Sequence, residues 1–307
     1  MIPVGHAHTH SHPSDQRGRL ALALIMTMMI LIAEVVGAWW TSSLALLADA
    51  GHMLTDTAGL AMALAAATLA ARPATPEHTW GLRRIEVLAA GAQAAVLLGV
   101  GLFALVEGVE RLVFPRPIAS LGLLVFGVVG LIGNLVSILI LASGRGSSLN
   151  MRAAFLEVVN DALGSVAVLV SAGVIAWTGW TRVDAIAGMV IAAFIVPRAV
   201  TIIREAGGIL MESTPKGLDL EEVRAHLSSV PHVLGVHDLH ASQIATGLPV
   251  LSAHIVLEDE CFADGHAARL LDGFQACVAE HFAVSIEHST FQLEPESHLA
   301  HEAHLHR

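Results

Sequence analysis

Charge of either sign is scarce in this sequence, because only 14% of its 307 residues are charged while 54% are hydrophobic. The mean hydropathy of +0.67 is too high for an ordinary soluble protein and predicts several membrane spans. Basic residues are fewer than acidic ones, and the net charge of −11 argues against a nucleic acid as a partner. Most of the acidic excess lies after residue 212, in a stretch with a soluble pattern.

Several common signatures are also missing. The two cysteines, Cys261 and Cys277, have no CxxC spacing, so no disulfide framework is expected. They are interpreted as ordinary small residues, with a free thiol as an accessory metal ligand as the alternative. Residues 1–16 are polar and rich in histidine, which argues against a signal peptide. No HExxH motif occurs, so an intramembrane metalloprotease would lack its general base, and no enzymatic activity is expected.

Six apolar stretches are long enough to cross a bilayer, which takes about 20 helical residues. They lie near residues 20–40, 44–70, 86–110, 118–142, 153–178 and 183–203. If the N-terminus is inside, most arginines fall on inner segments and only Arg111, Arg116 and Arg182 on outer loops. The positive-inside rule therefore predicts a multi-pass protein of the plasma or inner membrane with both termini in the cytoplasm.

The pattern changes after Pro215 to that of a small soluble domain. Helices are predicted at 218–229 and 266–281, and strands at 233–244, 250–257 and 284–293. The order α-β-β-α-β is typical of an α+β domain with its helices on one face of a sheet. The fold class is therefore an α-helical membrane protein with six transmembrane helices, followed by a small α+β domain.

Histidine-rich stretches lie at both ends of the chain. They are expected to be disordered, and either trap metal loosely or have no required role. The predicted domains are a tail at 1–17, a six-helix transmembrane domain at 18–212, an α+β domain at 213–294 and a second tail at 295–307.

Two pairs of metal-ligand residues lie inside the apolar stretches. His52 and Asp56 are four residues apart in the second stretch, as are Glu157 and Asp161 in the fifth. On a helix this spacing places both side chains of a pair on one face. Charged groups at mid-membrane cost roughly 2.5–3.5 kcal/mol on insertion scales and usually mark an ion or proton pathway. Together the pairs provide four N/O ligands, which suits a tetrahedral Zn²⁺ site and predicts a transporter of divalent metal ions.

Other polar residues in the spans have weaker interpretations. A helix–helix hydrogen bond is the alternative for any single polar residue in a span. Glu34, Asn134 and Ser137 are expected to face the interior of the helix bundle. Asp49 could pack, line the pathway or bind metal, whereas Asp184 opens the last span and could simply cap a helix.

These residues, in this order, resemble the cation diffusion facilitator family, whose members are six-span metal exporters with a cytoplasmic ferredoxin-like domain. The matching strings are residues 43–56, 81–90, 150–155, 160–165, 236–240 and 247–254. The resemblance covers about residues 18–294 and is closest to the branch of zinc and cadmium exporters. It implies export from the cytoplasm, exchange of metal for protons, and a homodimer in a lipid bilayer, with no cofactor apart from the metal itself.

By this resemblance His52, Asp56 and Asp161 are three of the four transport-site ligands, and Glu157 stands where the family commonly has histidine. Glutamate replaces a borderline nitrogen ligand with a hard oxygen ligand, which favours harder or larger ions. Glutamate still binds Zn²⁺, so zinc is the expected cargo and Cd²⁺, Co²⁺ and Mn²⁺ remain alternatives. Metal binding needs neutral His52 and ionised carboxylates, so it displaces protons, as an antiporter requires.

The resemblance also points to histidines outside the spans. His237, His254, His266 and His288 match positions that resemble cytoplasmic metal ligands in some family members, and His78 matches a position near an accessory site. The alternative for each is a surface or packing role. A non-transporting metal-sensing subunit would suit these histidines, but the intact ligand pairs in the spans weigh against it. Four tight ligands also favour a carrier over a channel, because conduction needs weak or multiple sites.

Overall fold

The computed structural model describes residues 13–70, 74–142, 149–263 and 265–301. Side chains are described throughout these ranges except at 13–21, 23, 56, 59–70, 149–154, 157 and 299–301. The chain folds into two compact units, Met1–Leu64 with Ala92–Ile202 and Ala65–Gly91 with Ile203–Arg307. The two histidine-rich ends, on which the metal-trap interpretation rests, lie largely outside the described residues.

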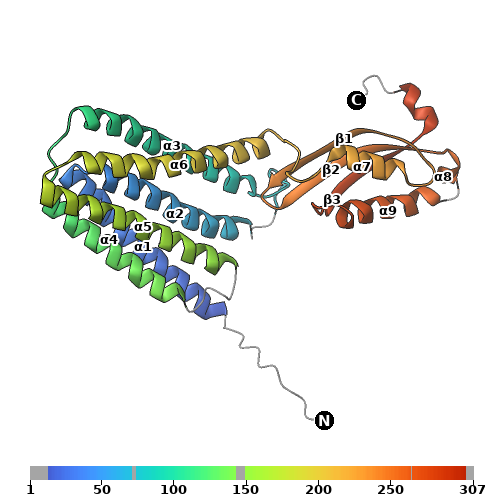
Figure 1. Cartoon of the computed structure of the whole chain (residues 1–307). Helices are drawn as coiled ribbons and strands as arrows, with labels where there is room; N and C mark the ends of the chain where they lie inside the picture. Colours follow the sequence, from blue (N-terminus) through green and yellow to red (C-terminus); the bar gives the residue numbers. More distant parts are fainter. Residues whose placement is uncertain (1–12, 71–73, 143–148, 264, 302–307) are drawn as a thin grey trace, which may run out of the picture. The chain divides into compact units, whose positions relative to one another are not determined.

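Six long helices occupy the apolar part of the described chain (Figure 1). They are α1 Pro13–Thr41, α2 Leu44–Ala70, α3 Arg84–Val113, α4 Ser120–Ala142, α5 Leu149–Thr178 and α6 Arg182–Leu210. A helix satisfies every backbone polar group within one segment, which is what a bilayer requires of a spanning chain. Among the described residues, five of these helices are long and apolar enough to cross a membrane, and α2 contributes the shorter apolar stretch Leu44–Thr55. The six predicted helices are thereby confirmed, five with the length and hydropathy of a full span and α2 with a shorter apolar stretch.

Small residues on α4 let its neighbours approach closely. The buried face of α4 includes Gly127, Gly130 and Gly133, spaced three residues apart. A Cβ added at Gly133 would lie 2.5 Å from the Ile30 side chain of α1, and one at Gly127 would lie 3.0 Å from Leu169 of α5. Helices in a membrane associate through such close packing. Helices α1, α4 and α5 therefore lie side by side (Figure 1).

The second unit contains the predicted α-β-β-α-β order. Its elements are α7 Leu220–Ser228, β1 Val233–Ala245, β2 Leu248–Leu257, α8 Glu260–Ala263, α9 His266–Glu280, β3 His288–Pro295 and the 3₁₀ helix η1 Glu296–His301. The sheet order is β1-β2-β3, with β1 antiparallel and β3 parallel to β2. The β1–β2 turn contains Gly247 at φ 72°, a conformation that glycine adopts without strain.

The last strand begins four residues later than the sequence pattern predicts. Ile286 is fully buried, and its backbone N–H donates to the Val278 carbonyl of α9 at 3.1 Å. That bond ties the segment to the helix before it reaches the sheet, so the apolar residues at 284 and 286 pack against α9 instead of joining β3. The short elements α8 and η1 were not predicted.

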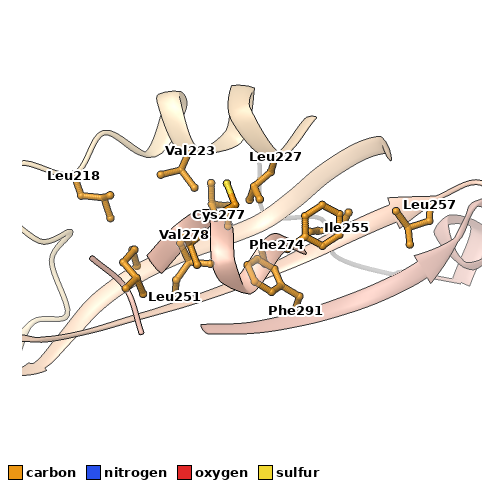
Figure 2. Close-up of a cluster of buried hydrophobic side chains, with 14 of the residues drawn as sticks. Leu218, Val223, Leu227, Leu251, Ile255, Leu257, Phe274, Cys277, Val278 and Phe291 are labelled. Carbon is orange, nitrogen blue, oxygen red and sulfur yellow. The ribbon is translucent and has the colours of Figure 1, made fainter. Parts of the chain in front are cut away.

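One face of the sheet carries the hydrophobic core of this unit. Alternate residues of β2, including Leu251, Ile255 and Leu257, point to this face and meet Phe274 of α9 and Leu227 of α7 (Figure 2). The period of two along a strand sends the intervening residues, among them His254, to the opposite face. The prediction that the helices cover one face of the sheet is therefore confirmed.

Candidate functional site

His52 of α2 and Asp161 of α5 approach each other inside the helical unit. The His52 Nε2 atom lies 3.9 Å from Asp161 Oδ1, and the two side chains are 16% and 2% exposed. These residues belong to different predicted ligand pairs, 109 positions apart in the chain. Their partners, Asp56 one turn later on α2 and Glu157 one turn earlier on α5, have side chains that lie outside the described residues. The structure thus brings one member of each pair together.

A cavity adjoins this pair. Its volume is about 520 Å³, and its walls come from α2, α5 and α6. Polar lining residues are Asp49, His52, Asn160 and Arg198. A hydrated ion entering the cavity would meet carboxylate, imidazole and amide groups, which are ligands that divalent metals accept in proteins.

Three carboxylates from three helices concentrate in the interior near the cavity. Glu34 of α1, Asp49 of α2 and Asp161 of α5 are each at most 3% exposed, and Glu34 interacts electrostatically with the other two. Asp49 Oδ1 and Glu34 Oε2 accept no hydrogen bond from the described part of the chain. Three buried negative charges repel one another strongly at low dielectric. Such a cluster is stable only when a cation or protons offset the charge.

Glu34 lies close to polar residues of the neighbouring helices. A Cβ added at Gly130 of α4 would lie 2.9 Å from Glu34 Oε1 and 3.1 Å from Ser165 Oγ of α5. Asn134 of α4 donates from Nδ2 to the same Ser165 Oγ at 3.2 Å. Glu34, Asn134 and Ser137 are all buried, which confirms the prediction that they face the bundle interior.

Asp184 caps the N-terminus of α2, the helix that contains His52. Its carboxylate, on the first turn of α6, accepts hydrogen bonds from the Ser43 hydroxyl and from the backbone N–H groups of Leu44, at 2.6 Å, and Ala45. These donors are at the N-terminus of α2, where helix N–H groups have no partner within the helix. Asp184 therefore caps a helix, as the sequence suggested, and the capped helix is α2 of the same unit.

Asp49 also lies in close contact with α5. A Cβ added at Gly164 would lie 2.1 Å from Asp49 Oδ1 and 2.9 Å from its Cγ. The absence of a side chain at Gly164 therefore lets α2 and α5 approach closely enough for His52 to reach Asp161.

We expect Gly164→Ala to lower the stability of the protein, because the added methyl group must displace a buried carboxylate or separate the two helices. Overpacking of this kind costs roughly 1–3 kcal/mol. Gly173→Ala is the matched control, since it lies on the same helix and a Cβ there meets nothing within 4 Å. Thermal unfolding of the two variants in detergent should show a lower midpoint for Gly164→Ala alone. Equal midpoints would show that the helices do not approach each other in this way.

A second group of potential metal ligands lies on the sheet face opposite the hydrophobic core. His237 of β1 is paired with His254 of β2, and Glu294 of β3 lies beside them. His254 Nδ1 is 2.9 Å from Glu294 Oε1, and His237 Nε2 is 3.3 Å from Glu294 Oε2. One ligand atom from each residue lies within 4.8 Å of the other two, close enough for a shared metal ion. The structure therefore joins His237 and His254, two of the four predicted histidines of this domain.

Sequence reasoning missed Glu294 as a member of this group. The predicted last strand ended at residue 293, one position before it. A strand extended by one residue would have placed Glu294 on the face opposite Phe291 and Leu293, which pack in or against the core. The alternation of residues along β3 was therefore the signal that could have found it.

An irregularity in β1 brings a further carboxylate to this group. Asp238 has a positive φ of 49° and lies where the strand register shifts between His237 and His240. Its two carboxylate oxygens lie 3.0 Å from His240 Nε2 and 3.7 Å from His254 Nε2. Carboxylates that contact ligating histidines orient the rings and raise their basicity.

The remaining predicted histidines lie elsewhere. His266 begins α9, and its ring centroid lies 5.0 Å from that of His232. His288 begins β3, and its ring centroid lies 4.6 Å from that of Trp80. His78 lies in an exposed turn, where its backbone N–H donates to the Thr75 carbonyl at 3.0 Å. None of these three joins the His237–His254–Glu294 group.

Comparisons with known proteins agree with this architecture. The family model described as the cation efflux transmembrane domain matches residues 20–211. The model described as the cytoplasmic domain of cation efflux proteins matches residues 215–296.

Individual relatives match over most of their length. The metal cation efflux system protein CzcD of Cupriavidus metallidurans is 42% identical over 264 residues, which cover 86% of this chain and 82% of that protein. The zinc transporter ZitB of Escherichia coli is 36% identical, with 88% and 86% covered. The cadmium, cobalt and zinc/H(+)-K(+) antiporter of Bacillus subtilis is 35% identical, with 87% and 86% covered. The chain therefore belongs to the cation diffusion facilitator family of multi-pass membrane proteins that export metal cations.

Proposed function

We propose that this protein exports Zn²⁺ from the cytoplasm in exchange for protons. The transported ion binds to His52, Asp56, Glu157 and Asp161. The observation that carries this proposal is the approach of His52 to Asp161, from separate helices, to 3.9 Å beside a cavity. Four N/O ligands suit the tetrahedral coordination that Zn²⁺ prefers. The relatives named for zinc transport support the choice of metal.

Proton exchange follows from the chemistry of these ligands. Zinc binds neutral imidazole and ionised carboxylates, so protons must leave before the ion enters and return after it leaves. The buried carboxylates of Glu34 and Asp49 would take part in this exchange, because Glu34 interacts electrostatically with both Asp49 and Asp161. Their buried negative charge must be offset by protons when no cation is bound. Rearrangement of the helices around the site would expose it to one side of the membrane at a time.

The remaining features of the proposal concern organisation. We place the transmembrane domain at 18–212, the cytoplasmic domain at 213–294 and the histidine-rich tails at 1–17 and 295–307, with both termini in the cytoplasm of a plasma or inner-membrane protein. The cytoplasmic domain supports a homodimer, as the family of its matching model suggests. The family consists of transporters, so no catalytic activity is proposed, and no cofactor beyond bound metal ions.

Zinc uptake by proteoliposomes with an imposed pH gradient tests the proposal. Uptake should require the gradient and stop when a protonophore abolishes it. Uptake of Cd²⁺, Co²⁺ and Mn²⁺ by the same proteoliposomes, measured one metal at a time, ranks the alternative cargoes by their transport rates. Zinc flux that is indifferent to the gradient would exclude antiport, and the absence of flux for all four metals would favour a metal-sensing subunit instead.

We further propose that His237, His254 and Glu294 hold a metal ion in the cytoplasmic domain. The observation that carries this is the proximity of two imidazoles to a carboxylate that is only 2% exposed. His266, His288 and His78 lie apart from this group and are proposed to contribute no ligand to it.

His254→Ala is expected to lower the number of tightly bound zinc ions by one per protomer in equilibrium dialysis of the full-length protein. Removal of a partner that only orients a ligand costs about 10–100-fold in affinity, so removal of a ligand should cost at least that much. His266→Ala is the control, because His266 lies beside His232 and outside the group. If both variants bind as much zinc as the parent protein, the group is only an ion-paired cluster.

A further inference from the structure

A third set of potential ligands lies at the C-terminal ends of α7 and α9, and neither the transport site nor the His237–His254–Glu294 group includes it. It consists of His226, Cys277 and His281. One ligand atom from each residue lies within 4.8 Å of the other two. We propose that these three residues bind a zinc-class metal ion on the cytoplasmic domain, with water as the fourth ligand.

Local helix geometry brings two of the ligands together. Cys277 and His281 are four residues apart at the end of α9, where the His281 backbone N–H donates to the Cys277 carbonyl at 3.0 Å. This spacing places both side chains on one face of the helix. His226, in the last turn of α7, completes the set, with its ring stacked on that of His281 at 5.2 Å between centroids and 27° between planes.

The burial of the three residues suits an accessible metal site. Cys277 is 6% exposed and free of any disulfide, whereas His226 and His281 are exposed. Cys277 lies in the same buried cluster as Val223 and Leu227 of α7, so its thiol is held between the two helices (Figure 2). A metal ion here would be bound by the thiolate on its buried side and by the two imidazoles on its solvent-exposed side.

The distances are compatible with metal binding after small movements. Tetrahedral zinc has bonds of roughly 2.0–2.3 Å, which places its ligand atoms about 3.3–3.8 Å apart. The observed separations of up to 4.8 Å therefore close with rotations of the two exposed histidines. The set of one thiolate and two imidazoles favours Zn²⁺, Co²⁺ or Cd²⁺ over Mg²⁺, Ca²⁺ or Mn²⁺.

Electrostatics at the helix ends also favours a cation. The last carbonyl groups of a helix have no intrahelical partner and carry the negative end of its dipole. Both α7 and α9 end at this set, because His226 is in the last turn of α7 and His281 caps α9. A bound ion would join the two helices that cover the core face of the sheet.

The site lies away from the other metal ligands of the domain. The His237–His254–Glu294 group is on the face of the sheet opposite the core, whereas α7 and α9 cover the core face. The transport site belongs to the other compact unit. Neither of these contains a cysteine, so a thiolate–metal bond reports on the proposed site alone.

Cobalt titration of the purified full-length protein in detergent tests the proposal. Co²⁺ bound by a thiolate gives an intense near-ultraviolet charge-transfer band that imidazole and carboxylate ligands do not give. We expect this band in the parent protein and in Cys261→Ser, and its loss in Cys277→Ser. In His226→Asn and His281→Asn, the cobalt affinity measured from this band should fall about tenfold or more. Cys261 is the matched control, since it is the other cysteine of the chain and is also buried and outside any disulfide.

Three outcomes would overturn the proposal. They are no band in the parent protein, a band that survives in Cys277→Ser, and unchanged cobalt affinity in both histidine variants. The last would show that His226 and His281 stack against each other, and with Phe282, only as packing. The exposed histidine variants keep the test valid if Cys277→Ser does not fold, and the readout needs no transport activity.

Discussion

Asp161→Asn should reduce zinc uptake by proteoliposomes to the level of protein-free vesicles. The substitution keeps the volume of the side chain and removes its charge, so a metal ion loses an anionic ligand without a cavity being created. Asp161 is 2% exposed, and its Oδ1 atom lies 3.9 Å from His52 Nε2, the candidate ligand atom of the facing helix. Loss of a group that merely supports a ligand costs about 10–100-fold in metal affinity, and loss of the ligand itself should cost at least that.

A matched control separates loss of the site from loss of charge in general. Glu110→Gln removes an acid of α3 that is 53% exposed and pairs with Arg116 at 3.0 Å. This variant should transport zinc at the parent rate, because exposed ion pairs contribute little. Thermal unfolding of Asp161→Asn in detergent checks that the variant is folded. A folded Asp161→Asn protein that transports as fast as the parent would place the transport site elsewhere.

The second large effect concerns the choice of metal at Glu157. Glu157→His restores the residue that the family commonly has at this position and replaces a hard oxygen ligand with a borderline nitrogen. Imidazole suits Zn²⁺, Co²⁺ and Cu²⁺, whereas carboxylate suits Mn²⁺ and other hard ions. We expect the ratio of zinc to manganese transport to rise about tenfold, equivalent to about 1.4 kcal/mol of relative preference. Competition between the two metals in proteoliposomes measures this ratio directly.

Asn160→His is the control for this experiment. It adds an imidazole three residues further along α5, where Asn160 lines the cavity. A shift in metal preference that is equal in the two variants would mean that an added histidine anywhere near the cavity is sufficient. A shift in Glu157→His alone supports Glu157 as a ligand, and no shift in either variant would remove Glu157 from the site.

Much of the architecture could be predicted from local patterns. Apolar runs of membrane length predict spanning helices because a helix satisfies its own backbone, whatever surrounds it. The alternation at 233–244 and 250–257 predicts strands for a similar reason, since a sheet with one buried face needs a period of two. The i, i+4 spacing of His52 with Asp56 and of Glu157 with Asp161 depends only on helix geometry.

Positions in space between distant segments could not be predicted in this way. Whether α2 and α5 meet depends on how deep each helix lies in the membrane and on the close contact at Gly164. Neither can be predicted from the sequence of one segment alone. The same holds for Asp184, whose carboxylate caps α2 from α6, 140 residues away from Leu44.

The sequence by itself therefore predicted the six long helices, the α+β domain and the family, and it gave the spacing of the two candidate ligand pairs. Only the tertiary structure added Glu294 to the histidines of the sheet, separated His266 and His288 from them, and placed Cys277 beside His226 and His281. The physical reason is the range of the interactions. Hydrogen bonding and hydrophobic periodicity act within a few residues of the chain, whereas a metal site is defined by side chains that packing brings together from separate elements.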